Sequence, residues 1–239
     1  MAEDGRPVEA QLLAGLALRA APTHLSEEVS DCPSRRFGRE GYRAALLSRS
    51  RQRLDRLVTT LADEGVEAEG FTADVTRPDE VVDALAGARS RFGGIDVLEY
   101  SPAPHAPGEG MDQVGALEVT PETIQPQFER ILYGAVAAAR AVLPDMLQRG
   151  SGTVLLTTNA SASLPLPPLA NVGMAGAELK NWAQNLHAVA SDRGVYVAHV
   201  VLATFIGQGG PETQPDTIAD LYWDLHPTRK GPEHLYPPR

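Results

Sequence analysis

Apolar positions follow two alternating periods along most of the chain. Short, almost continuous apolar runs such as YRAALLS at 42–48 and GTVLLTT at 152–158 are typical of strands buried on both faces of a sheet. Between such runs, apolar residues recur every three or four positions, as in the segment 50–65, which is typical of an amphipathic helix. The same criteria predict further strands at 66–75, 95–101 and 195–206, and helices at 77–93, 120–150, 172–194 and 213–227.

This alternation of strands and helices predicts how the strands pair. Successive strands that are joined by helices run parallel in one sheet. We therefore expect an α/β fold, a Rossmann-like doubly wound parallel sheet in a single domain, for which 239 residues is a suitable length. The pattern starts only near residue 35, so the chain divides into an atypical N-terminal segment at 1–34, a Rossmann-like domain at 35–228 and a loose C-terminal tail at 229–239.

Two of the predicted helices are rich in small residues. The segments are GAVAAARA at 134–141 and GMAGA at 173–177. Small side chains there either let a helix pack closely on the sheet, which is the more common arrangement, or leave room for a ligand or a partner helix. Because such faces also form subunit interfaces, we expect a homo-oligomer.

Charge, hydropathy and cysteine content narrow the range of partners. The formal net charge is −10 and no block of Lys or Arg occurs, which argues against nucleic acids and anionic membranes. No apolar run approaches the roughly 20 residues that span a bilayer. The apolar stretch at 12–18 follows acidic residues, whereas an export signal carries positive charge there. The single cysteine, Cys32, allows no internal disulfide, so we expect a cytoplasmic protein.

Five segments in a fixed order carry a family resemblance. The chain resembles the short-chain dehydrogenase/reductase family, most closely a divergent bacterial branch with EYSPA after the third strand and ADLYW near the C-terminus. The resemblance implies a nicotinamide dinucleotide cofactor, NADP or NAD, and hydride transfer to or from a small carbonyl or alcohol. The segments are RRFGREGYRAALLSRSRQRL (35–54), FTADVTRPDEV (71–81), RFGGIDVLEYSPA (91–103), AVLPDMLQRGSGTVLLTT (141–158) and DRGVYVAHV (192–200).

The resemblance places the adenosine side of the cofactor at the ends of three strands. Arg49 falls where the family contacts the adenosine ribose, and a guanidinium there would pair with a 2′-phosphate, which slightly favours NADP; the alternative is a solvated arginine. Asp74 and Val75 match the family's contacts to the adenine edge, although an aspartate after a strand also caps turns. Ser101 falls in the family's NNAG motif, with Tyr100 in the first Asn position.

The N-terminal segment departs from the family pattern. A member of the family starts with a strand and a Gly-rich turn whose backbone approaches the pyrophosphate. Only Gly5 and Gly15 precede Gly38 here, and no apolar strand followed by a glycine cluster is evident. Either the helix-forming residues at 7–21 fill the space in another way, or residues 1–34 are not the original beginning of the gene.

The family's catalytic residues are also replaced. In the register of the resemblance, the catalytic Tyr falls on Val172, the Lys on Gly176, the Ser on Asn159 and the Asn on Ile131. Neither Val nor Gly can shuttle a proton, whereas the Asn159 amide can donate a hydrogen bond to a carbonyl oxygen. Lys180 lies one helical turn beyond Gly176 and is expected to face elsewhere.

Other polar side chains near these positions are weaker candidates. We interpret Ser161, Ser163 and His105 as solvated loop residues, and Tyr133 as a core aromatic. No P-loop, nucleophile elbow or metal-ligand spacing occurs. The sequence therefore favours a short-chain dehydrogenase-like NAD(P)-dependent oxidoreductase with weak or impaired activity. The alternative is a catalytically inactive binding or partner protein on the same scaffold.

Overall fold

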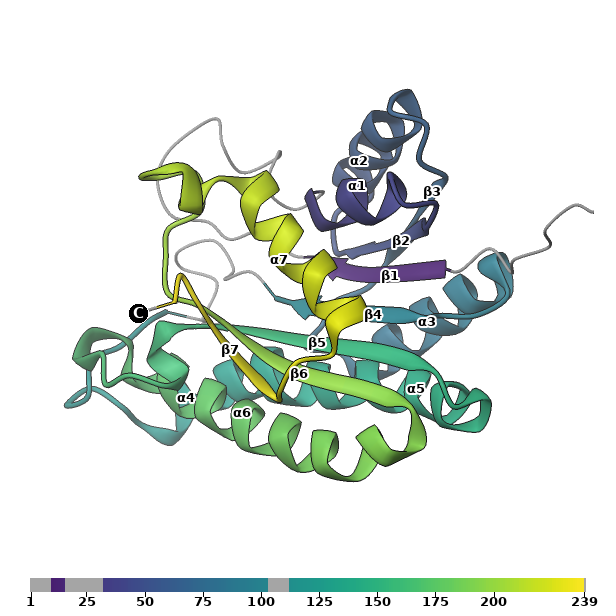
Figure 1. Ribbon diagram of the computed structural model, residues 1–239. Coiled ribbons are helices and arrows are strands. Elements are labelled where there is room, and N and C mark those ends of the chain that lie inside the picture. Colours follow the sequence, from purple (N-terminus) through teal and green to yellow (C-terminus); the bar gives the residue numbers. More distant parts are fainter. Residues whose placement is uncertain (1–9, 16–31, 103–111, 239) are drawn as a thin grey trace, which may run out of the picture.

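The computed structural model describes residues 10–15, 32–102 and 112–238 and contains one parallel sheet (Figure 1). Its seven strands occur in the order β3-β2-β1-β4-β5-β6-β7, and every neighbouring pair is parallel. This order confirms the predicted doubly wound, Rossmann-like fold. The strands are β1 (Ala10–Gly15), β2 (Arg43–Ser48), β3 (Ala68–Thr72), β4 (Val97–Ser101), β5 (Gly152–Asn159), β6 (Val195–Leu202) and β7 (Glu233–Tyr236).

Helices cover both faces of the sheet (Figure 1). One face packs against α3, α5 and α6 in the largest apolar cluster, and the other packs against α1 and α7 near the centre and α2 near the β3 edge. A short helix, α4, continues through the π-helical segment η1 into α5. The helices are α1 (Cys32–Gly38), α2 (Arg51–Asp63), α3 (Pro78–Phe92), α4 (Pro121–Gln127), η1 (Phe128–Tyr133), α5 (Gly134–Arg149), α6 (Ala170–Ala190) and α7 (Pro215–Thr228), with short 3-10 turns η2 (Ala160–Ala162), η3 (Pro167–Leu169), η4 (Ser191–Arg193) and η5 (Pro211–Thr213).

The first strand is present, contrary to the sequence analysis. Residues 10–15 form β1 in the centre of the sheet, where Leu12 pairs with Ala45 of β2 and with Leu98 of β4. Without this strand, β2 and β4 would bury unpaired backbone groups, which is costly. Pairing on both sides therefore outweighs the helix propensity of the surrounding residues. Residues 16–31, where the family has its Gly-rich turn, lie outside the described part of the chain.

The C-terminal segment is a second correction. We expected a loose tail at 229–239, but Glu233–Tyr236 form β7, which pairs in parallel with β6. A local pattern does not reveal this strand because its four residues are only half-buried and lie at the sheet edge.

The small residues of α5 pack against the sheet, as the more common of the two explanations predicts. Ala135, Ala138 and Ala139 are buried in the same apolar cluster as Tyr100 of β4 and Val154 of β5. Helix α5 can approach the strands closely because these side chains add little volume. This approach brings the preceding π-helical segment over the carboxyl end of β4.

Candidate cofactor and substrate site

The residues predicted for the site lie along one edge of the sheet. Because all strands are parallel, their carboxyl ends lie together, and ligands of such folds bind at this edge. Ser48 at the end of β2 pairs with Thr72 at the end of β3, and Gly15 of β1 pairs with Ser101 at the end of β4. Arg49, Asp74, Val75, Ser101 and Asn159 each fall at or just after one of these strand ends.

Arg49 lies between β2 and the N-terminus of α2. The residue is exposed, and the neighbouring Ser50 caps α2 by accepting a hydrogen bond from the Arg53 backbone N–H at 3.2 Å. The Ser50 N–H in turn donates to Ser48 Oγ at 3.3 Å. A cation beside a helix N-terminus is suited to an anionic group, because both carry positive potential.

Asp74 caps the turn after β3. Its Oδ1 accepts hydrogen bonds from the backbone N–H and the hydroxyl of Thr76, at 2.9 and 2.7 Å, and the Asp74 N–H donates to Glu80. This is the turn-capping arrangement that the sequence analysis left open. Val75 is buried, and its carbonyl oxygen lies against Gly134 at the start of α5.

A buried arginine holds the end of β4. Arg130 of η1 donates to the Pro102 carbonyl at 2.9 Å and to Gln127 Oε1 at 2.7 Å. Burial lowers the pKa of Arg130 to about 10, so the guanidinium stays charged at neutral pH. The Tyr100 hydroxyl donates to the Arg130 carbonyl at 2.6 Å, and burial raises the pKa of Tyr100. The sequence analysis missed Arg130, although a lone arginine in FERILY is a signal for a buried, bonded cation.

Asn159 has a defined orientation at the end of β5. Its Oδ1 accepts hydrogen bonds from the backbone N–H of Ser161 at 2.9 Å and from the Ser161 hydroxyl. Since a backbone N–H can only donate, the oxygen must be the atom that faces Ser161. The Nδ2 donors therefore point away from this turn, and they have no partner within residues 10–15, 32–102 and 112–238.

The positions matched to the family's Tyr and Lys are filled by close packing. Val172 is buried in α6. A β-carbon at Gly176 would lie 2.8 Å from Ala162 Cβ, and one at Gly173 would lie 2.9 Å from the Ser161 carbonyl oxygen. Helix α6 thus packs directly on η2, leaving no room for a lysine at position 176 without a shift of that turn.

Lys180, one helical turn beyond Gly176, is bonded to β7 and to the segment after η2. Its Nζ lies 2.7 Å from Glu233 Oε1 and donates to Ser163 Oγ at 3.2 Å, and Ser163 also donates to Glu233. Burial would raise the pKa of Glu233, but the hydrogen bonds from Lys180 and Ser163 outweigh it and lower the pKa. Ser163 is therefore a structural residue, and this group ties β7 to α6.

Glu99 is a buried acid that the sequence analysis did not identify. Glu99 lies in β4 and accepts a hydrogen bond from the Thr157 hydroxyl of β5 at 3.2 Å. The same hydroxyl lies 2.8 Å from the Tyr222 hydroxyl of α7. Burial raises the pKa of Glu99 to about 8, against the smaller effect of hydrogen bonds from Thr157 and Ser101. Glu99 is thus largely protonated at neutral pH, next to a predicted cofactor residue.

The structure also places Tyr133 and a buried histidine, His199. Tyr133 is 43% exposed and contacts Phe128 edge-on, so its interpretation as a core aromatic is wrong. His199 of β6 is buried, with Nε2 2.8 Å from Thr158 Oγ1, and burial lowers its pKa to about 4. It is therefore neutral at pH 7. His105 lies outside the described residues.

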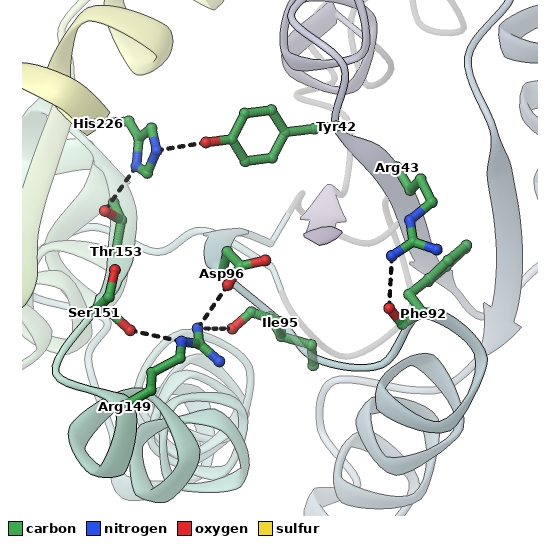
Figure 2. A network of polar contacts seen from close by, with 9 residues as sticks. All are labelled: Tyr42, Arg43, Phe92, Ile95, Asp96, Arg149, Ser151, Thr153 and His226. Atoms are coloured by element: carbon green, nitrogen blue, oxygen red, sulfur yellow. Dashed lines mark hydrogen bonds and ion pairs between the residues drawn. The ribbon is translucent and has the colours of Figure 1, made fainter. Parts of the chain in front are cut away.

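A second polar network occupies the opposite, amino edge of the sheet (Figure 2). The His226 ring lies between Tyr42 Oη and Thr153 Oγ1, at 2.8 Å from each. Arg149 forms an ion pair with Asp96 at 3.0 Å and also donates to backbone carbonyls. These contacts join α7 and α5 to the starts of the strands, far from the carboxyl edge, so they are structural.

Neither a membrane-spanning helix nor a metal-binding group of side chains is found in the described part of the chain. Each helix within residues 32–102 and 112–238 is too short or too polar to cross a membrane. The same ranges hold no group of three or more His, Cys, Asp or Glu side chains placed to bind a metal ion.

Comparison with known proteins decides the family. A model of the family described as "short chain dehydrogenase" matches residues 31–208. The chain belongs to the short-chain dehydrogenase family. Among its relatives in the family are a bovine dehydrogenase/reductase SDR family member 4, 28% identical over 74% of this chain and 62% of that protein, and a very-long-chain 3-oxoacyl-CoA reductase of Anas platyrhynchos, 24% identical over 78% of this chain and 59% of that protein. The chain thus spans less than two thirds of the length of either relative.

Solved structures share the fold over nearly the whole chain. A short-chain dehydrogenase from Rhodopseudomonas palustris has a TM-score of 0.79 at 18% identity and covers 97% of this chain and 99% of its own. The L-sorbose reductase of Gluconobacter frateurii, solved with NADPH and L-sorbose, has a TM-score of 0.78 at 18% identity and covers 95% of this chain and 94% of its own. The named relatives are dehydrogenases and reductases, and the site geometry limits what chemistry the residues of this chain can perform.

Proposed function

We propose that this chain is a NAD(P)-dependent oxidoreductase, with NADP slightly favoured, that transfers hydride to or from a small carbonyl or alcohol at a reduced rate. The observation that carries the proposal is the alignment of Arg49, Asp74, Ser101 and Asn159 along the carboxyl edge of one parallel sheet. A dinucleotide extended along that edge would pass the first three residues at its adenosine side and reach Asn159 at its nicotinamide end.

The residues at the adenosine side fit such a cofactor. Arg49 is an exposed cation beside the N-terminus of α2, which suits a 2′-phosphate. Structural neighbours support this assignment, since the titles of two of them name NADPH or NADP as the bound cofactor. When bound, a nicotinamide dinucleotide would supply or accept the hydride.

The chain's own polar groups would handle the substrate oxygen. The Asn159 Nδ2, oriented by Ser161, would donate a hydrogen bond to the carbonyl oxygen and stabilise the charge that develops there. Val172 and Gly176 cannot move a proton, so the product oxygen would take its proton from solvent. General acid–base catalysis is typically worth about 10²–10⁴-fold, and we expect the rate to be reduced by that order.

Replacing Arg49 tests the cofactor assignment. In Arg49→Gln the affinity for NADPH should fall by about tenfold or more, because one charge-assisted pair with the 2′-phosphate is lost, while any affinity for NADH should hardly change. Isothermal titration of the purified protein with both cofactors measures this, with Arg56→Gln on the exposed side of α2 as the matched control. Absence of heat with either cofactor at about millimolar concentration would instead favour the inactive scaffold protein.

Replacing Asn159 tests the substrate side. Asn159→Asp keeps the oxygen that caps the Ser161 turn but removes the Nδ2 donor. We expect kcat/KM for reduction of a ketone by NADPH to fall by about 100-fold, as for other oxyanion donors, with NADPH affinity unchanged. The matched control is Ser161→Ala, which keeps the backbone hydrogen bond and should alter kcat/KM by less than about threefold. Equal rates in Asn159→Asp and the wild type would remove Asn159 from the proposed site.

Cellular location and assembly complete the proposal. We infer a cytoplasmic protein from the single cysteine and the acidic composition. We also infer a homo-oligomer, for which the long helices α5 and α6 can provide an interface on the sides that do not pack against the sheet or η2. Light scattering of the purified protein measures the assembly directly.

A further inference from the structure

Positive charge is distributed unevenly along the carboxyl edge of the sheet. The segment that leaves β2 carries Arg49, Arg51 and Arg53 within five residues. In contrast, the sequence contains no Lys or Arg between Arg91 and Arg130, none between Arg149 and Lys180, and none between Arg193 and Arg229. These three intervals contain every segment that leaves the carboxyl ends of β4, β5 and β6.

The cations that border these intervals are bonded to other groups of the protein. Arg130 is buried and bonded to Pro102 and Gln127. Lys180 forms its ion pair with Glu233.

The remaining bordering cations lie toward the amino edge. Arg149 bonds to the Ser151 carbonyl, Arg229 bonds to the Gly194 carbonyl, and Arg193 directly precedes β6. Arg91, in the last turn of α3, pairs with Glu67 and Glu69. Each of these bordering cations therefore lies toward the amino edge, is buried as Arg130 is, or is paired with a carboxylate as Lys180 is.

The charges that the described parts of these segments carry have the opposite sign. Within 112–120, 160–169 and 203–214 the charged side chains are Asp112, Glu118 and Glu212. Among the described residues, an anionic group entering between these segments would thus lose its hydration without gaining an uncompensated cation, which is strongly unfavourable.

Large apolar side chains are exposed on the same segments. The segments after β4 and β5 also contact each other, because the Ala116 N–H donates to the Pro167 carbonyl and the Ala170 N–H donates to the Val114 carbonyl, both at 3.1 Å. Together the described parts of these two segments form one surface beside the carboxyl end of β5, and this surface carries no positive charge. The exposed apolar residues on the segments and on the start of α6 are Leu117 (97%), Leu166 (38%), Met174 (43%) and Phe205 (66%).

We propose that the substrate of this site is an uncharged, largely apolar carbonyl compound or the corresponding alcohol, and not a carboxylate or a phosphate ester. The inference rests on the proposed oxidoreductase function and assigns its substrate class. Apolar contact with the exposed side chains provides the affinity, and the Asn159 amide fixes the oxygen. Arg49, at the β2 end, is the cation that we assign to the cofactor.

A matched pair of probes tests this assignment. Methyl phenylglyoxylate and phenylglyoxylate carry the same ketone, but only the second has a carboxylate. We expect NADPH-dependent reduction of the neutral ester with a kcat/KM at least about 100-fold above that of the anion, because the carboxylate meets no cation. Saturation-transfer NMR with the NADP-loaded protein should show the same preference in binding.

Introducing a cation tests the electrostatic cause of the preference. Phe205→Arg should lower the ratio of kcat/KM for the ester to kcat/KM for the anion by about tenfold or more. Val189→Arg places the same charge on an exposed site in the last turn of α6, away from the carboxyl edge, and should leave the ratio unchanged. Both positions are exposed, so neither variant should disturb folding.

The outcomes separate this inference from the function on which it rests. No heat with NADPH overturns the proposed function and the inference together. If the protein binds NADPH but its kcat/KM or its affinity for the anion is within about tenfold of that for the ester, the substrate class alone is overturned. If the ratio of kcat/KM for the ester to kcat/KM for the anion is the same in Phe205→Arg and the wild type, the proposed substrate class is overturned as well. The preference would then not arise from the lack of positive charge.

Discussion

Gly134→Ala is expected to lower the free energy of unfolding by about 2–3 kcal/mol and to weaken NADPH binding. Gly134 begins α5, and a β-carbon there would overlap the Tyr100 hydroxyl and would lie 2.5 Å from the Val75 carbonyl oxygen. Both neighbours are buried, and Tyr100 is fixed by its hydrogen bond to the Arg130 carbonyl. The helix must therefore move away from the carboxyl ends of β3 and β4, where we place the adenosine of the cofactor.

A second helical glycine is the matched control. In Gly87→Ala of α3 the new β-carbon would meet only the ring of Phe71, at 3.2 Å, and this half-buried side chain can shift slightly. Alanine also favours a helix over glycine by nearly 1 kcal/mol, so the control should stay within about 1 kcal/mol of the wild type. Urea unfolding measures both variants, and equal stabilities for the two would contradict the packing described at Gly134.

Glu99→Gln is expected to abolish a large pH dependence of stability. In the folded protein, burial raises the pKa of Glu99 to about 8 from an ordinary value of 4.5. Between these values the folded state keeps a proton that the unfolded state releases, so the stability of the wild type falls as the pH rises through this window. One pKa unit corresponds to 1.36 kcal/mol, so the shift from 4.5 to about 8 gives a loss of stability of about 5 kcal/mol.

The glutamine variant lacks this titration but keeps an oxygen that can accept from Thr157. It should match the wild type near about pH 5 and exceed it by a few kcal/mol near about pH 9. Urea unfolding at both values measures the difference, and Glu178→Gln on the exposed side of α6 is the control. If the free energy of unfolding depends on pH in the same way in Glu99→Gln and the wild type, Glu99 is ionised in the folded protein at neutral pH.

Much of the fold could be predicted because the sheet is buried on both faces. Apolar runs such as those of β5 and β6 are then nearly continuous, and they differ in period from the amphipathic helices between them. The order of strands and helices along the chain places Arg49, Asp74 and Ser101 at or just after the ends of three strands. That these residues share one edge of the sheet then follows from parallel pairing alone. The family resemblance added the cofactor class, which no local pattern supplies.

The candidate site was harder to predict because its properties depend on contacts between distant segments. Glu99 looked like one more residue of a strand, and only its burial beside Thr157 and Tyr222 makes it a protonated acid. Arg130 likewise gains its role from Pro102, 28 residues away along the chain. Lys180 also gains its partner Glu233 from a strand that the sequence analysis took for a loose tail.

The sequence by itself determined the order of strands and helices between residues 42 and 227, the edge at which the residues after the strands meet, and the lack of a side chain that can transfer a proton at positions 172 and 176. These properties depend on residue type and local period, which the chain carries at each position. Only the tertiary structure decided that residues 10–15 complete the centre of the sheet, that β7 forms its edge, and that Ala162 occupies the space beside Gly176. Strand pairing and close packing satisfy backbone groups and fill volume between segments far apart in sequence, so no single segment contains that information.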